Sequence, residues 1–342
     1  MTHVQLTLWA GFAVGLMFGI AAQRSRFCFT GGLREWWTDK NPRRAGALFV
    51  SLAIAVLGTQ SLVLFGIVDV NPSLYLTHTF SWLLIPIGGV LFGVGMMLAR
   101  SCGSRALVLL ASGNLRSLLV LLCLGVSAGI ALTGPLAVWR LNLTDLTAVT
   151  LPYASLPEWI GADALGFHVG RLTLTLILAS ALFALGLFRF RLLRCPGDVL
   201  GAVVIGLTIA AGWWVTGHLG ADDFEPVTLE SLTFVAPISD SLQYLMLSSG
   251  MRAGFALTVI VGILLGAWVT ALVTGQFEWQ GFENPAQMRR AIIGGVLMGV
   301  GGALAMGCTV GQGLTGLSTL SISSFIAVLG ILCGARMGLR WA

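Results

Sequence analysis

Six cysteines are the residues of this chain whose chemistry is most distinctive. No two of them form a C-x-x-C pair or have the spacing of zinc ligands. A disulfide framework is not expected either, because such frameworks are typical of small secreted domains. Three stand in polar or Gly-rich motifs: Cys28 in R-F-C-F-T-G-G, Cys102 in S-C-G-S and Cys308 in G-C-T-V-G-Q-G-L. The other three, Cys123, Cys195 and Cys333, lie in apolar runs or beside a proline, and we expect them to be ordinary small side chains.

A neutral thiol is a weak S–H donor and a soft, polarizable contact. A thiolate is the nucleophilic form and would repel an anion. Neutral thiols in series therefore suit weak, reversible contacts, which a conducting site needs so that its ligand can leave.

The composition indicates that these thiols lie in a membrane. Of the 342 residues, 56% are hydrophobic and 10% charged, and the mean hydropathy is +0.91. Soluble domains carry about 25% charged residues. The 45 glycines agree, because small residues let membrane helices approach closely. The net charge of +5 is spread singly or in pairs between apolar runs, so it predicts no nucleic-acid partner. We expect the lipid bilayer to be the main partner of this surface.

Apolar runs of about 20 residues are long enough to cross a bilayer as helices. They predict an all-α polytopic membrane protein with about nine transmembrane helices, plus short re-entrant half-helices near 102–113 and 308–320. The nine runs are 4–22, 45–68, 81–99, 118–138, 168–188, 198–217, 253–275, 290–306 and 324–340.

The loop charges predict an orientation. Arginines gather in segments 34–44 and 189–194, at Arg289 and Arg290, and near the C-terminus, whereas segments 69–80 and 218–250 hold no Lys or Arg. By the positive-inside rule the N-terminus is expected to be periplasmic and the C-terminus cytoplasmic, in the bacterial inner membrane.

An internal repeat is the strongest pattern in the chain. Segments 87–102 and 293–308 are identical at eleven of sixteen positions, and each ends at a cysteine. The loop charges place the two copies in opposite directions, an arrangement common in secondary transporters. We therefore predict two inverted halves, 1–140 and 168–342, joined by a periplasmic connecting segment, 141–167.

Each repeat copy ends in a turn that breaks the helix at membrane depth. Such backbone must be buried in protein or line a wet cavity. A short helix that starts after the break would point its positive N-terminal end at this centre and favour anions. The candidate substrate-contacting or vestibule residues are Arg24, Arg26, Arg100, Gly103, Arg105, Thr309, Gly311 and Gln312, with Cys28, Cys102 and Cys308 along the path.

The three cysteine motifs resemble those of the YeeE/YedE family of sulfur-compound transporters, and the resemblance extends over nearly the whole chain. It implies import of thiosulfate through an hourglass-shaped protein, with Cys28, Cys102 and Cys308 along the path. It also implies a partner, a small soluble sulfur-carrier protein of the TusA type at the cytoplasmic face. No enzyme activity, cofactor or metal is expected.

The middle motif departs from the family pattern, which has Gly-Gly before this cysteine and Ala-Thr-Gly after it. Here Arg100 and Ser101 precede Cys102, and Ser104 and Arg105 follow Gly103. A related oxyanion or a selenium compound stays open as the substrate. Two other classes also stay open: a membrane thiol enzyme that transfers sulfur, and an accessory subunit of a larger complex.

Overall fold

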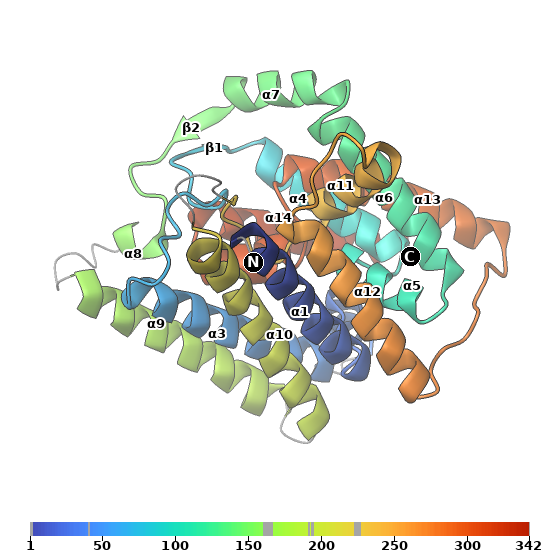
Figure 1. Ribbon diagram of the computed structural model, residues 1–342, viewed down its shortest axis with the longest axis horizontal. Coiled ribbons are helices and arrows are strands. Elements are labelled where there is room, and N and C mark those ends of the chain that lie inside the picture. Colours follow the sequence, from blue (N-terminus) through green and yellow to red (C-terminus); the bar gives the residue numbers. More distant parts are fainter. Residues whose placement is uncertain are drawn as a thin grey trace.

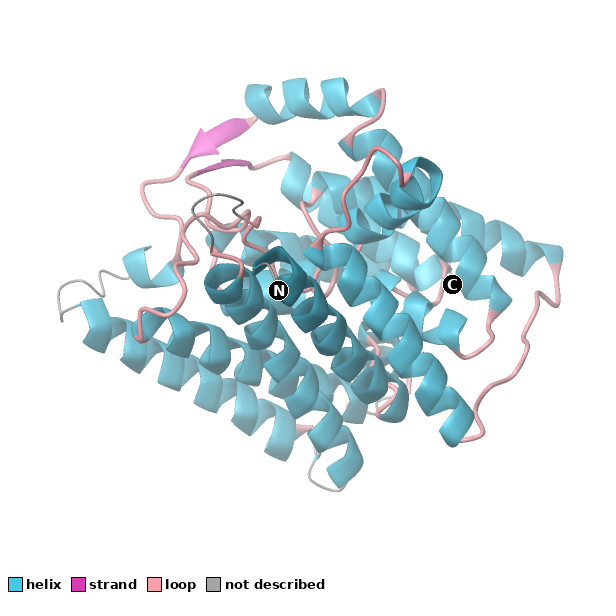
Figure 2. Ribbon diagram, in the orientation of Figure 1, coloured by secondary structure: helices cyan, strands magenta, loops and turns pink. Residues whose placement is uncertain are grey.

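The computed structural model describes residues 3–39, 42–159, 167–190, 192, 195–221 and 227–341. Helices make up most of this part, and two short antiparallel strands pair Thr79 with Thr150 (Figure 2). The elements, including three π-helical turns (η), are α1 (His3–Arg24), α2 (Phe29–Thr38), α3 (Arg43–Leu64), β1 (Thr79–Ser81), α4 (Leu84–Leu98), α5 (Gly103–Ala111), α6 (Leu115–Leu132), α7 (Leu136–Leu146), β2 (Ala148–Thr150), α8 (Leu156–Trp159), α9 (Phe167–Ala184), η2 (Leu185–Arg189), α10 (Pro196–Trp214), η4 (Val215–Leu219), α11 (Val235–Leu247), α12 (Phe255–Val273), α13 (Pro285–Leu304), η5 (Gly311–Gly316) and α14 (Ile322–Gly338).

The long helices form two groups. In the first, α9, α3, α10, α1 and α12 lie side by side, each packed against the next (Figure 1). In the second, α6, α13, α4 and α14 pack in that order. Short elements connect the groups: α5 contacts α6, α12 and α1, and η5 contacts α3, α10 and α14. The elements that start after Cys102 and Cys308 therefore lie between the two groups.

The two repeat copies, α4 and α13, pack against each other in opposite directions. A methyl group on Gly88 would lie 2.7 Å from the Gly301 carbonyl oxygen, and one on Gly95 would lie 2.6 Å from the Gly294 carbonyl oxygen. In the repeat Gly88 corresponds to Gly294 and Gly95 to Gly301. The two contacts are thus equivalent under a pseudo-two-fold rotation axis, as expected for inverted copies.

The outer neighbours follow the same symmetry. Gly89 of α4 faces the backbone of α14 at Ala327 and Ile331, and the corresponding Gly295 of α13 faces the backbone of α6 at Val120 and Leu124. Small residues thus bring the four helices of the second group together through their backbones.

Each of the nine predicted apolar runs is helical in the structure. Within the described residues, however, seven helical segments meet the length and apolarity needed to cross a membrane; α14, with 17 residues, is shorter, and α13 is not among the seven. The predicted count of nine spans is therefore not confirmed. The predicted connecting segment, 141–167, contains part of α7, β2, α8 and the first residue of α9, and its residues 160–166 lie outside the described part. The boundaries of the two halves stay a prediction.

We predict that Gly301→Ala destabilises the protein by about 1–3 kcal/mol, the usual cost of overpacking a close contact. The added methyl group would lie 2.5 Å from the Phe92 amide nitrogen. The measurement is the thermal unfolding midpoint of the purified protein in detergent. Gly281→Ala is the matched control, because nothing lies within 4 Å of its added methyl group. Equal midpoints for the two variants would contradict the close packing of α4 on α13.

Candidate functional site

The three motif cysteines occupy similar structural positions: Cys28 and Cys102 are the N-cap residues of α2 and α5, and Cys308 stands in the turn that leads into η5, two residues before its N-cap Val310. In each case the cysteine carbonyl accepts the backbone N–H of the fourth residue after it. The donors are Gly32 for Cys28 (2.9 Å), Ala106 for Cys102 (2.8 Å) and Gln312 for Cys308 (2.8 Å). Three apolar segments far apart in sequence therefore break in the same way.

Two of the three thiols accept a backbone N–H at these helix starts. The Gly31 N–H donates to Cys28 Sγ and the Gly311 N–H donates to Cys308 Sγ, both at 3.2 Å. Cys102 Sγ instead lies 3.4 Å from Ser104 Oγ. Ser, Thr, Asp and Asn are the usual caps at this position. Cysteine places a polarizable sulfur at the positive end of each short helix.

A left-handed residue precedes each cysteine by two positions. The backbone φ angles are 50° at Arg26, 55° at Arg100 and 56° at Met306. At each joint the following residue donates its N–H to a carbonyl five residues back, as in a Schellman motif. These bonds are Phe27 N to Ala22 O (3.1 Å), Ser101 N to Met96 O (3.2 Å) and Gly307 N to Gly302 O (2.9 Å). A side chain in this conformation costs about 1–2 kcal/mol, so the surrounding packing must hold all three joints.

The fold brings the three cysteines near one another. Cys102 is close enough to act electrostatically on both Cys28 and Cys308. Cys102 and Cys308 are 0% and 1% exposed, whereas Cys28 is half-buried. The η5 turn also touches the first motif, because a methyl group on Gly313 would lie 3.1 Å from the Phe29 ring.

A cavity of about 180 Å³ opens at Cys28 and is rich in arginine. Among the described residues that line it, none is acidic. We call it the arginine cavity; its lining comprises Arg26, Cys28, Thr30, Gly31, Arg34, Arg44, Met97, Arg100, Arg105 and Leu109.

Three predicted residues, Arg26, Arg100 and Arg105, thus meet in the arginine cavity. The sequence reasoning missed Thr30, Arg34 and Arg44 as lining residues. The helical spacing of Thr30 and Arg34 was the available signal for two of them, because residues four apart share a helix face. Arg44 comes from a different helix, α3, and is held by an ion pair with Glu35 at 2.6 Å.

Arg24 lies elsewhere. It lines a neighbouring hollow of mixed charge together with Arg43 and the carboxylates Glu35, Asp39 and Asp198. Arg43 pairs there with Asp198 at 2.9 Å. The acidic side chains distinguish this hollow from the arginine cavity.

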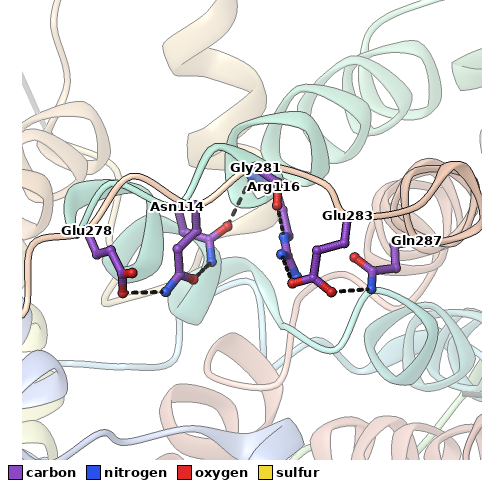
Figure 3. Close-up of polar contacts among 7 residues, drawn as sticks. Asn114, Arg116, Glu278, Gly281, Glu283 and Gln287 are labelled. Atoms are coloured by element: carbon purple, nitrogen blue, oxygen red, sulfur yellow. Dashed lines mark hydrogen bonds and ion pairs between the residues drawn. The ribbon is translucent and has the colours of Figure 1, made fainter.

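Arg100 also lines a larger cavity of about 610 Å³ between the α5–α6 turn and the start of α13. The loop before α13 is fastened to that turn (Figure 3). Arg116 pairs with Glu283 at 2.8 Å and donates to the Gly281 carbonyl, and Asn114 donates to Gln280 at 2.9 Å. The wall of the larger cavity is therefore held by contacts between two distant segments.

The predicted residues near Cys308 are buried. Gln312 donates its Nε2 to the Ala305 carbonyl at 2.7 Å and so satisfies the end of α13. Within the described part of the chain, Gln312 Oε1 and Thr309 Oγ1 are buried without a hydrogen-bond partner. Gly311 must be small, because an added methyl group would lie 2.6 Å from Thr233 Oγ1. Gly103 makes ordinary contacts, the nearest being with Ile238 at 3.4 Å.

Two residues near Cys308, Tyr75 and Thr233, were not predicted. Both hydroxyl groups lie close to Gly311: a methyl group added there would be 2.6 Å from Thr233 Oγ1 and 3.4 Å from the Tyr75 hydroxyl oxygen. Burial raises the pKa of Tyr75, and the hydrogen bond from its neighbour Thr233 partly opposes this shift. Tyr75 comes from the irregular loop after α3, where no motif marked it.

A separate cavity of about 440 Å³ lies beside the start of α1 and α12, and Glu230 and Asp240 line it. Burial, followed by repulsion from Asp240, raises the pKa of Glu230 to about 7. Burial also raises the pKa of Asp240.

These features define a class of protein: a multi-pass helical membrane protein with inverted repeats and broken helices that meet at its centre, the architecture of many secondary transporters. The comparisons with known proteins are specific. The chain belongs to the sulphur transport family, whose sequence profile matches residues 24–337.

Two curated relatives extend over nearly the whole chain. One is the thiosulfate transporter TsuA of Escherichia coli (strain K12), 25% identical over 343 residues, which cover 95% of this chain and 92% of that protein. The other is TsuA of Spirochaeta thermophila, 27% identical over 350 residues and 96% of each protein. The probable transporter YedE of Escherichia coli (strain K12) is 32% identical over 102 residues, 30% of this chain and 23% of that protein. The family predicted from the cysteine motifs is confirmed.

We predict that Glu230→Gln stabilises the protein above pH 7. Folding raises the pKa of this carboxyl group from 4.5 to about 7, so the folded state holds its proton more tightly than the unfolded chain does. The protonated Glu230 side chain therefore makes its full contribution to the free energy of unfolding below about pH 4.5, and this contribution is lost as the pH rises through 7. The amide cannot ionise, so the variant should gain on the order of 1–3 kcal/mol over wild type at pH 8 and little at pH 5.

The measurement is the thermal unfolding midpoint at both pH values. Asp145→Asn is the control, because it removes one charge from an exposed carboxylate. A Glu230→Gln midpoint that follows wild type at both pH values would contradict the burial of this group.

Proposed function

We propose that the protein takes up thiosulfate, or a closely related sulfur anion, across the bacterial inner membrane along a path lined by Cys28, Cys102 and Cys308. One observation supports this most directly: the three thiols lie near one another, and each stands where the chain enters a short helical element. The names of the two full-length relatives supply the substrate.

The arrangement fits the charge and softness of thiosulfate. The dianion carries its charge on oxygens and on a terminal sulfur atom. Helix N-termini and arginine side chains stabilise the negative charge. A thiol gives the terminal sulfur a soft, weak contact. Weak sites in series allow the ion to pass from one thiol to the next without being trapped.

The path is closed in this structure. Cys102 and Cys308 are almost completely shielded from solvent, and only Cys28 borders the arginine cavity. Transport therefore requires a movement that opens the space around Cys308 to one side of the membrane. The strained joints before the three cysteines are the elements whose rearrangement would reach the thiols most directly.

We further propose that the N-terminus is periplasmic and the C-terminus cytoplasmic, and that a TusA-like sulfur carrier accepts sulfur at the cytoplasmic face. The loop charges support the orientation, and the family resemblance supports the carrier. The family assignment favours transport over sulfur-transfer catalysis, because the relatives are named as transporters.

We predict that Cys28→Ala, Cys102→Ala and Cys308→Ala each reduce thiosulfate uptake at least about tenfold. Loss of the thiol removes a site from the path, while the change in stability stays on the order of 1 kcal/mol. Cys→Ser should also fail, because a hydroxyl is less polarizable and holds water more firmly. The measurement is uptake of labelled thiosulfate by vesicles that contain only the purified protein.

The matched control is the triple variant Cys123→Ala, Cys195→Ala and Cys333→Ala. Cys123 lies in α6, Cys195 precedes α10, and Cys333 is exposed on α14. Near-normal uptake is expected from this variant. Normal uptake by the single variants of the motif cysteines would disprove the thiol path. Growth on selenite or sulfite but not on thiosulfate would change the substrate and leave the path intact.

The predicted orientation is tested with single reporter cysteines in a background that lacks accessible cysteines. A reporter at Asn71 should react with a membrane-impermeant maleimide in intact cells. A reporter at Gly281 should react only after the membrane is permeabilised. Both positions are exposed. Reaction of both reporters from the same side would refute the inverted topology.

A further inference from the structure

The three motifs that follow the cysteines differ in charge at one position. The third residue after the cysteine is Gly31 in the first motif and Gly311 in the third, and in both its N–H donates to the thiol. In the second motif this residue is Arg105. In the internal repeat Arg105 corresponds directly to Gly311, so the two halves differ by a charge at equivalent places.

The Arg105 side chain is a cation that forms no ion pair with a carboxylate of the described residues. Its Nη1 atom is buried and has no hydrogen-bond partner within the described residues. The groups that act on it electrostatically there are the thiols of Cys28 and Cys102 and two further cations, Arg44 and Arg26. A buried charge is stable only when it is paired and hydrogen-bonded. Among the described residues, none of the groups that act electrostatically on Arg105 is a carboxylate.

The arginine cavity has the other features of an anion site. Thr30 lines it, is 2% exposed, and its hydroxyl has no partner in the part of the chain that the structure describes. Cys28 and Gly31 contribute the N-terminus of α2, a helix of 10 residues. Arg26, Arg34 and Arg100 are exposed around the cavity, so solvent reaches it from one side.

We propose that Arg105 is the specificity-determining residue of this transporter. It binds a doubly charged sulfur oxyanion in the arginine cavity, with the oxygens on the guanidinium and the Thr30 hydroxyl and the soft sulfur end on the Cys28 thiol. This proposal rests on the proposed function. A planar guanidinium suits the oxygens of such an anion because it can donate two parallel hydrogen bonds.

The consequence is a step in affinity along the path. At Gly311 the anion meets backbone dipoles and neutral hydroxyl groups, whereas at Arg105 it meets a fixed positive charge. The site at Arg105 therefore fills at a lower anion concentration than the site at Gly311, and it prefers dianions over monoanions. Arg100 borders both the arginine cavity and the larger cavity, so it lies where the anion would leave.

The test compares Arg105→Gln, Arg105→Lys and Arg105→Gly in vesicles that contain the purified protein. Arg105→Gln should raise the KM for thiosulfate roughly tenfold or more with kcat unchanged or increased, because one charge-assisted contact is lost. Arg105→Lys keeps the charge and should stay within about threefold of wild type. Arg105→Gly reproduces the residue found in the other two motifs and should behave like Arg105→Gln.

Arg189→Gln is the matched control, because Arg189 lies in a separate hollow with Trp36 and Phe190. Its KM should equal that of wild type. Equilibrium binding of thiosulfate, sulfate and the monoanion thiocyanate to each purified variant provides the second readout. Wild type should prefer the dianions, and Arg105→Gln should lose most of this preference while keeping its thermal midpoint. An unchanged KM and an unchanged preference in Arg105→Gln would overturn the proposal.

The results separate the two levels of inference. Normal thiosulfate uptake by wild type and by Arg105→Gln alike would refute the role of Arg105 and leave the proposed function in place. Failure of wild type to transport thiosulfate, together with sulfate binding that depends on Arg105, would refute the proposed function and support the anion site.

Discussion

The satisfaction of backbone polar groups at three helix breaks is the constraint on which this structure depends. In a membrane an interrupted helix exposes N–H and C=O groups that lipid cannot bind. Here a left-handed residue turns the chain, and the next residue donates its N–H to a carbonyl at the end of the preceding helix. The carbonyl of the cysteine then accepts the first backbone N–H of the next helical segment. The same few residues therefore close the backbone hydrogen bonds and place a thiol at the positive end of a helix.

Close glycine packing fixes the positions of the helices that lead into two of these breaks. Because α4 and α13 touch backbone to backbone in opposite directions, the breaks at their ends approach the centre from opposite sides. The outer helices α6 and α14 repeat the same contacts under the pseudo-two-fold axis. A larger residue at these glycines would separate the helices and move the thiols apart.

The symmetry is local, and the departures from it matter for function. The three cysteines share a left-handed residue two positions before them and a backbone hydrogen bond to the carbonyl, but their surroundings differ. Cys28 and Cys102 have Arg105 beside them, whereas Cys308 has Gly311, Thr233 and Tyr75 in its neighbourhood. The surroundings of Cys28 and Cys102 are thus positively charged and those of Cys308 are neutral, which would give the proposed path a direction.

The sequence by itself determined the helical membrane class, the positions of the long apolar helices, the repeat and the family, because these depend on composition and on residue patterns within single segments. It also predicted Cys28, Cys102 and Cys308 as residues of the path. The tertiary structure decided which side chains gather at the thiols. Arg44 of α3 lines the arginine cavity, whereas Arg24 lines the hollow of mixed charge. Tyr75 and Thr233, which lie near Gly311, belong to loops without a motif. The physical reason is that a cavity is formed by side chains from several elements, and local patterns do not specify how those elements pack.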